Sequence, residues 1–172
     1  MQVIDVVVFV LIGICGITDL RTGKIYNKVT YPAILLGLSW NVWMPDALGW
    51  WSRIEGFALA AVLMGALTLM GGMGGGDAKL LAAIGALKGY PFILDVLFYS
   101  FLVGGVIALA IAIWQRRFLR ILGNVWRMLL AILIYRSKPE TAEDETGSYK
   151  IPFGLAICLG TLWAQLLELL RG

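Results

Sequence analysis

The sequence contains no histidine, and few of its residues carry charge. None of the 172 residues is histidine and 15% are charged, whereas about 25% of the residues in an average soluble domain are charged. Because imidazole is the commonest general base and metal ligand, this composition excludes Ser-His-Asp, Cys-His and His-zinc chemistries. Cys15 and Cys158 stand singly in apolar segments and are interpreted as small buried hydrophobic residues. We therefore expect no metal site and no cofactor.

Long apolar segments fill most of the chain. Hydrophobic residues make up 60% of it, and the mean hydropathy is +0.85. Because a bilayer crossing needs about 20 apolar residues, we predict an all-α, polytopic membrane protein with about six transmembrane helices in a single domain, 1–172. The apolar segments lie at about 3–18, 30–44, 54–72, 78–90, 91–114 and 151–170. The fourth would extend only about 20 Å as a helix, so it either re-enters the membrane or thins it locally.

Basic residues are distributed unevenly between the two faces of this predicted topology. If all six segments cross, only Arg53, Lys88 and Arg171 fall on one face, and the other eleven Lys and Arg residues share the opposite face. The positive-inside rule places the eleven in the cytoplasm and the N-terminus outside. This explains the positive charge better than nucleic acid does, and no nucleic-acid partner is expected. Residues 3–18 lack a basic start and a small-residue cleavage site, which favours a retained span over a signal peptide.

The region between the fifth and sixth segments is amphipathic and then polar. Arginines alternate with Leu, Ile and Trp over Gln115–Tyr135, which predicts a helix lying in the headgroup plane rather than a seventh span. Residues 136–150 carry four acids and are interpreted as a solvated loop: Glu140, Glu143, Asp144 and Glu145.

Two carboxylates stand out because they lie at span ends. Asp19 closes the first segment, and Asp77 follows the third within the glycine-rich stretch 71–79. Spans one and three cross in the same direction, so we expect both side chains at one face. Two carboxyl groups that share a site cannot easily both ionise, so the pair would hold one proton as a coupled dyad. One member can then take a proton from water while the other polarises a carbonyl, which predicts peptide hydrolysis without histidine, serine or metal.

The residues around Asp77 allow more than one interpretation. Gly74 and Gly76 would shape the loop and permit close approach of an extended substrate backbone, although Gly71 and Gly72 could simply end a helix. The Gly-Lys-Ser/Thr order of a phosphate-binding loop is absent. Lys79 could bind a substrate carbonyl or tune Asp77, or it could only follow the positive-inside rule. The remaining acids, including Asp5, Asp95 and Glu168, are expected to be structural or solvated.

Taken together, these motifs resemble a known family. Gly74-x-Gly76-Asp77-x-Lys79 is similar to the G-x-G-D motif of intramembrane aspartyl proteases, in the prepilin peptidase (type IV leader peptidase) branch. Asp19 matches the family's other aspartate, and the stretches 72–86 and 151–154 resemble bacterial members. One departure is Ile25-Tyr26-Asn27, where the family often has Ile-Pro-Asn.

The resemblance implies a specific activity. A member with catalytic Asp19 and Asp77 would remove a short basic leader from prepilin-like substrates, usually after a glycine, at the cytoplasmic face of the inner membrane. Without the N-terminal insert linked to N-methylation, the chain is similar to the short Flp/Tad-type or archaeal preflagellin peptidases. A basic leader could also be attracted by the acidic loop 140–145.

Two other classes of function remain open at this stage. A proton-coupled carrier or channel could use paired membrane acids beside glycine-broken helices, but it would place those acids near the middle of the bilayer. A non-enzymatic membrane subunit could use the glycines only for helix packing.

Overall fold

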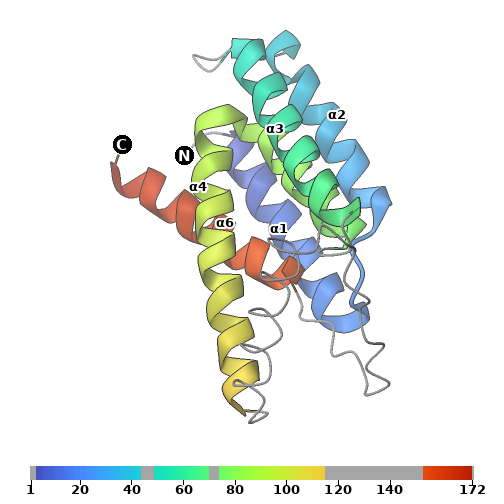
Figure 1. Ribbon diagram of the computed structural model, residues 1–172. Coiled ribbons are helices and arrows are strands. Elements are labelled where there is room, and N and C mark those ends of the chain that lie inside the picture. Colours follow the sequence, from blue (N-terminus) through green and yellow to red (C-terminus); the bar gives the residue numbers. More distant parts are fainter. Residues whose placement is uncertain (1–2, 44–48, 70–73, 115–152, 172) are drawn as a thin grey trace, which may run out of the picture. The chain divides into compact units, whose positions relative to one another are not determined.

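The computed structural model describes residues 3–43, 49–69, 74–114 and 153–171. All regular structure in these ranges is helical, as predicted (Figure 1). The helices are α1 (Val3–Thr22), α2 (Asn27–Trp43), α3 (Gly49–Leu69), α4 (Gly75–Trp114) and α6 (Phe153–Arg171). The packing discussed below lies within one compact unit, which holds the described residues up to Gly104 together with α6. The predicted interfacial helix at 115–135 and the acidic loop at 136–150 lie outside the described residues.

Four of these helices are long and apolar enough to cross a membrane. They are α1, α3, residues Gly75–Ile111 of α4 and residues Phe153–Leu170 of α6. The chain is therefore a multi-pass membrane protein. Helix α2 has 17 residues and would extend about 25 Å. Helix α1 continues four residues past the predicted end of the first segment, so Asp19 lies within its last turns rather than after it.

Helix α4 consists of two helical halves that meet at Gly89. The backbone of Gly89 has φ 79° and ψ −176°, a left-handed conformation that glycine adopts without steric cost. Pro91 follows and has no backbone N–H to continue the helical ladder. The chain reverses direction at this point (Figure 1). The two predicted segments at 78–90 and 91–114 correspond to the two halves.

The first half of α4 lies in the centre of the packed helices. Every residue from Leu80 to Gly89 is buried, and the side chains of Leu80, Ile84 and Leu87 are completely inaccessible. A helix that is apolar on all sides is stable when protein surrounds it. Because its neighbours rather than lipid surround this segment, it does not have to match the full thickness of the hydrocarbon core.

Glycines allow the neighbouring helices to approach this central helix closely. A Cβ atom added to Gly56 of α3 would lie 2.6 Å from the carbonyl oxygen of Gly85 and 2.6 Å from the carbonyl carbon of Gly89. A Cβ atom on Gly37 of α2 would lie 2.6 Å from the carbonyl carbon of Ala86. Small residues at helix crossings permit backbone contact, which is the main source of helix association in lipid.

Replacement of Gly56 tests this packing. Gly56→Ala should lower the free energy of unfolding by about 1–3 kcal/mol, because the added methyl group meets backbone atoms that cannot move away. The matched control is Gly65→Ala on the same helix, where no atom lies within 4 Å of the added Cβ. The control should be neutral or stabilising by up to about 1 kcal/mol. Reversible unfolding in mixed micelles measures both, and equal stabilities of the two variants would contradict the packing.

Candidate active site

The end of α1 fixes the position of Asp19. Gly23, with φ 60°, donates its backbone N–H to the carbonyl oxygen of Asp19 at 2.8 Å. A glycine in the left-handed conformation just after a helix is a common way to satisfy its last carbonyl groups. The Asp19 side chain is buried among the helices, with 8% of the residue exposed.

The first turn of α6 contacts the carboxylate of Asp19. The backbone N–H of Leu155 donates a hydrogen bond to Asp19 Oδ2 at 3.0 Å. A Cβ atom on Gly154 would lie 2.7 Å from the same oxygen, so only glycine permits this approach. The N-terminus of a helix presents free N–H groups and partial positive charge, which favour a carboxylate there. The sequence pattern at 151–154 did not predict this role for Gly154.

Asp77 lies in the first turn of α4 and is held by the loop before it. Its backbone N–H donates to the carbonyl oxygen of Gly74 at 3.1 Å. A Cβ atom on Gly74 would lie 3.1 Å from Asp77 Oδ2, so the carboxylate turns back over this glycine. The preceding residues 70–73, which include Gly71 and Gly72, lie outside the described residues.

Ile25 connects the surroundings of the two aspartates. Its Cβ would lie 3.0 Å from a Cβ on Gly76, next to Asp77, and its Cδ1 would lie 3.0 Å from a Cβ on Gly154, which contacts Asp19. Ile25 therefore lies next to the surroundings of both acids, which come from α1 and α4. The sequence interpretation mentioned Ile25 only as part of a departure from the family pattern.

Lys79 links the starts of α4 and α2. Its Nζ donates a hydrogen bond to Asn27 Oδ1 at 2.9 Å and lies 5.1 Å from the centre of the Tyr31 ring. Within the described part of the chain Lys79 forms no ion pair with Asp77. Its contacts hold the helix that carries Asp77 against α2.

Two thiols lie where α1 packs against α6. Cys15 and Cys158 are buried and free, which confirms their interpretation as small buried hydrophobic residues. A Cβ on Gly16 would lie 3.5 Å from Cys158 Sγ, so α1 and α6 are in close contact next to the aspartate.

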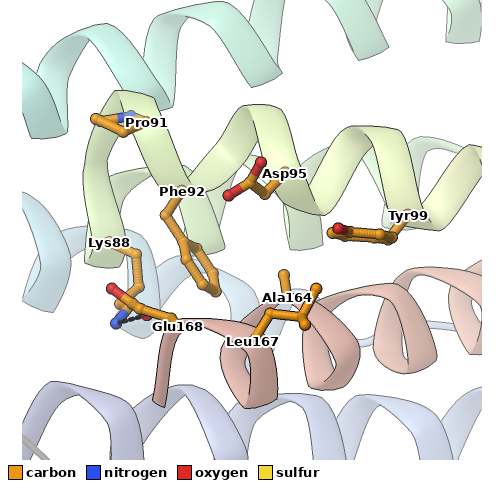
Figure 2. A pocket seen from close by; sticks show the side chains of 8 residues that line it. All are labelled: Lys88, Pro91, Phe92, Asp95, Tyr99, Ala164, Leu167 and Glu168. Carbon is orange, nitrogen blue, oxygen red and sulfur yellow. Dashed lines mark ion pairs between the residues drawn. The ribbon is translucent and has the colours of Figure 1, made fainter. Parts of the chain in front are cut away.

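A cavity of about 240 Å³ lies between the second half of α4 and α6 (Figure 2). Its polar lining includes Lys88, Asp95 and Glu168. Lys88 is eleven residues after Asp77 on the first half of α4, a distance of about 16 Å along a helix. The cavity is therefore separate from the candidate active site.

The chain is similar in sequence to proteins of one known family. The type IV leader peptidase family matches residues 6–109, a range that includes Asp19 and Asp77. A prepilin leader peptidase/N-methyltransferase of Xanthomonas campestris pv. campestris is 38% identical over 110 residues, which cover 60% of this chain and 37% of that protein. The chain thus matches little more than a third of the relative's length. No solved structure matches the chain. Because the family match extends over more than half of its residues, the chain belongs to the type IV leader peptidase family.

Proposed function

We propose that this protein is a membrane aspartyl endopeptidase in which Asp19 and Asp77 form the catalytic dyad. Its substrates would be prepilin-like proteins, from which it removes a short basic leader, usually after a glycine. The observation that supports the proposal is that Ile25 contacts Gly76, next to Asp77, and also Gly154, which contacts Asp19, so the surroundings of the two acids share one side chain. Membership of the type IV leader peptidase family supports the reaction class, and the Xanthomonas relative is named a prepilin leader peptidase.

The mechanism follows from two carboxyl groups that share one proton. The ionised carboxylate accepts a proton from a water molecule as the water oxygen attacks the scissile carbonyl carbon. The protonated carboxyl donates a hydrogen bond to the carbonyl oxygen and stabilises the charge that develops there. When the tetrahedral intermediate collapses, the C–N bond breaks and a carboxyl proton passes to the leaving amine. The Leu155 N–H and Gly154 would hold Asp19 in place throughout.

The proposed topology has six crossings, made by α1, α2, α3, the two halves of α4 and α6. As one straight helix, the 37 residues from Gly75 to Ile111 would extend about 55 Å, whereas the hydrocarbon core is about 30 Å thick. The reversal at Gly89 supports two crossings instead. With six crossings the N-terminus lies outside, and the dyad lies in the inner membrane at the cytoplasmic face with eleven of the basic residues.

The location of the acids favours the peptidase over a proton-coupled carrier or channel. Asp19 is in the last turns of α1 and Asp77 is in the first turn of α4. A carrier would hold its acids near the middle of the bilayer, whereas these positions suit cleavage next to a membrane-embedded substrate helix.

Neutral replacement of either aspartate should abolish cleavage. Asp19→Asn and Asp77→Asn each remove one member of the acid–base pair, and we expect the turnover rate to fall by about 10²- to 10⁴-fold or more. Purified protein would be incubated with a peptide that carries a basic leader, a glycine and an apolar segment, and the products would be identified by mass spectrometry. Glu55→Gln changes an exposed acid on α3 and should keep full activity. Wild-type turnover in either aspartate variant would contradict the dyad.

Gly154→Ala should reduce turnover without preventing substrate binding. The new methyl group would displace either the Asp19 carboxylate or the first turn of α6, and a misplacement of about 1 Å can cost about 100-fold in rate. We expect kcat to fall while KM changes little. The matched control is Gly13→Ala on α1, where no atom lies within 4 Å of the added Cβ. A wild-type kcat for Gly154→Ala would show that this contact does not position the dyad.

A further inference from the structure

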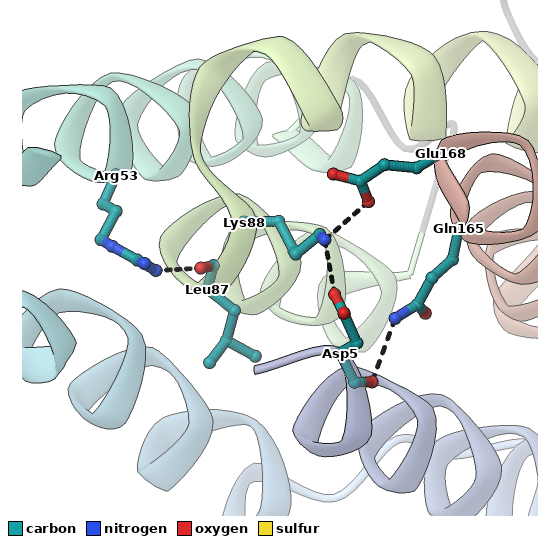
Figure 3. A network of polar contacts seen from close by, with 6 residues as sticks. All are labelled: Asp5, Arg53, Leu87, Lys88, Gln165 and Glu168. Carbon is teal, nitrogen blue, oxygen red and sulfur yellow. Dashed lines mark hydrogen bonds and ion pairs between the residues drawn. The ribbon is translucent and has the colours of Figure 1, made fainter. Parts of the chain in front are cut away.

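Figure 3 shows a network of ion pairs and hydrogen bonds around Lys88. Asp5 lies near the start of α1 and Asp19 near its end, so the network and Asp19 lie at opposite ends of this helix. Lys88 of α4 is only 5% exposed. Its Nζ lies 2.7 Å from Asp5 Oδ1 on α1 and 2.6 Å from Glu168 Oε2 on α6. Gln165 of α6 adds a hydrogen bond of 3.0 Å from its Nε2 to the backbone carbonyl oxygen of Asp5. One ammonium group therefore connects three helices.

The same three helices meet again at the dyad. Helix α1 carries Asp5 near its start and Asp19 near its end, and α4 carries Asp77 in its first turn and Lys88 at the end of its first half. Helix α6 contributes the Leu155 N–H at its start and Glu168 near its end. Each of the three helices thus carries residues of both regions, which are separated by roughly 16–21 Å along each helix axis.

The packing of α4 against α6 is incomplete next to Lys88. The cavity of about 240 Å³ lies between α4 and α6 beside this residue, with Phe92 and Leu167 in its lining (Figure 2). A side chain that borders a cavity lacks contact atoms on that side. The Lys88 ammonium also lies 4.8 Å from the centre of the Phe92 ring. This cation–π contact helps to hold the lysine side chain in place. The ion pair between Lys88 and Glu168 therefore adds a directional contact between α4 and α6 where the packing is incomplete.

We propose that Lys88, Asp5 and Glu168 are positioning residues that set the register of α1, α4 and α6 and thereby the geometry of the distant dyad. The proposal rests on the proposed function. None of the three touches the reacting groups, so each acts only through its helix.

The magnitude of the effect follows from helix geometry. A tilt of about 5° over roughly 17 Å moves the far end of a helix by about 1.5 Å. That displacement would break the 3.0 Å hydrogen bond from Leu155 to Asp19. Because a shift of about 1 Å in a catalytic group can cost about 100-fold in rate, loss of the network should be measurable in turnover even if the bundle stays folded.

The test separates positioning from stability. Removal of Lys88 alone would take an ion-pair partner away from the buried carboxylate of Asp5, and the chain could fail to fold. The double variant Asp5→Leu with Lys88→Met instead replaces the buried pair by apolar side chains of similar size, an exchange that is often neutral or stabilising. Glu168→Gln is a milder second variant, because the Glu168 side chain is 51% exposed. Asp95→Asn is the matched control, since it neutralises an exposed acid on the same cavity.

Two measurements are made on each variant alongside unfolding in mixed micelles. The first is kcat and KM for cleavage of the prepilin-like peptide. The second is the rate at which maleimide labels Cys158 in a Cys15→Ser background, because Cys158 packs against α1 beside the dyad. Provided that the double variant stays folded in the unfolding measurement, we expect its kcat to be about 10- to 100-fold lower, with KM little changed and labelling several-fold faster. Glu168→Gln should show the same changes to a smaller extent, and Asp95→Asn should show none.

The outcomes distinguish the two proposals. Wild-type kcat and wild-type labelling of Cys158 in a stable double variant would overturn the positioning role. If the double variant does not fold, an unchanged kcat and an unchanged labelling rate in Glu168→Gln would overturn it instead. If the parent protein cleaves no prepilin-like peptide, the proposed function fails, but the labelling rates still decide whether the network sets the register of α1 and α6.

Discussion

The approach of the first turn of α6 to the carboxylate of Asp19 is the contact on which the candidate site depends. It joins α1 and α6, which are far apart in the sequence, because the hydrogen-bonded residues Asp19 and Leu155 are separated by 136 positions. A carboxylate that is taken out of water needs hydrogen-bond donors to offset the loss of its hydration. The α6 N-terminus supplies a donor and a favourable dipole, and Gly154 leaves the space for them.

The rest of the bundle makes this contact possible by surrounding one short helix. The first half of α4 is apolar on all sides and buried from Leu80 to Gly89. Neighbouring helices reach its backbone through Gly56 and Gly37, and its start carries Asp77. Because the hydrophobic effect does not drive helices together within lipid, such close van der Waals packing and buried polar contacts must do so. The bundle therefore uses glycine contacts at its centre and hydrogen bonds or ion pairs at its two ends.

The sequence predicted the helical class and the approximate helix positions, because periodicity and hydropathy are local properties. The placement of Asp19 and Asp77 on one face follows from the parity of the predicted spans and stays a prediction. The sequence did not predict the contacts of Gly154, Ile25 and Lys79, because these depend on how distant helices pack. It also expected Asp5 and Glu168 to be structural or solvated, without identifying Lys88 as their common partner. The topology placed Lys88 at the outer face, but a hydropathy pattern cannot show that a lysine is buried between two acids.

Cross-linking in native membranes tests the central claim, which is that Asp19 and Asp77 face each other across one site. The paired substitutions Asp19→Cys and Asp77→Cys, in a chain with Cys15→Ser and Cys158→Ser, would be treated with a short bifunctional thiol reagent. The matched control pairs Asp77→Cys with Glu55→Cys, because Glu55 precedes Gly56, which packs against Gly89 at the far end of the short helix. The account predicts an efficient intramolecular cross-link for positions 19 and 77 and none for the control pair. No cross-link between 19 and 77, under conditions in which both thiols react with a monofunctional reagent, would contradict it.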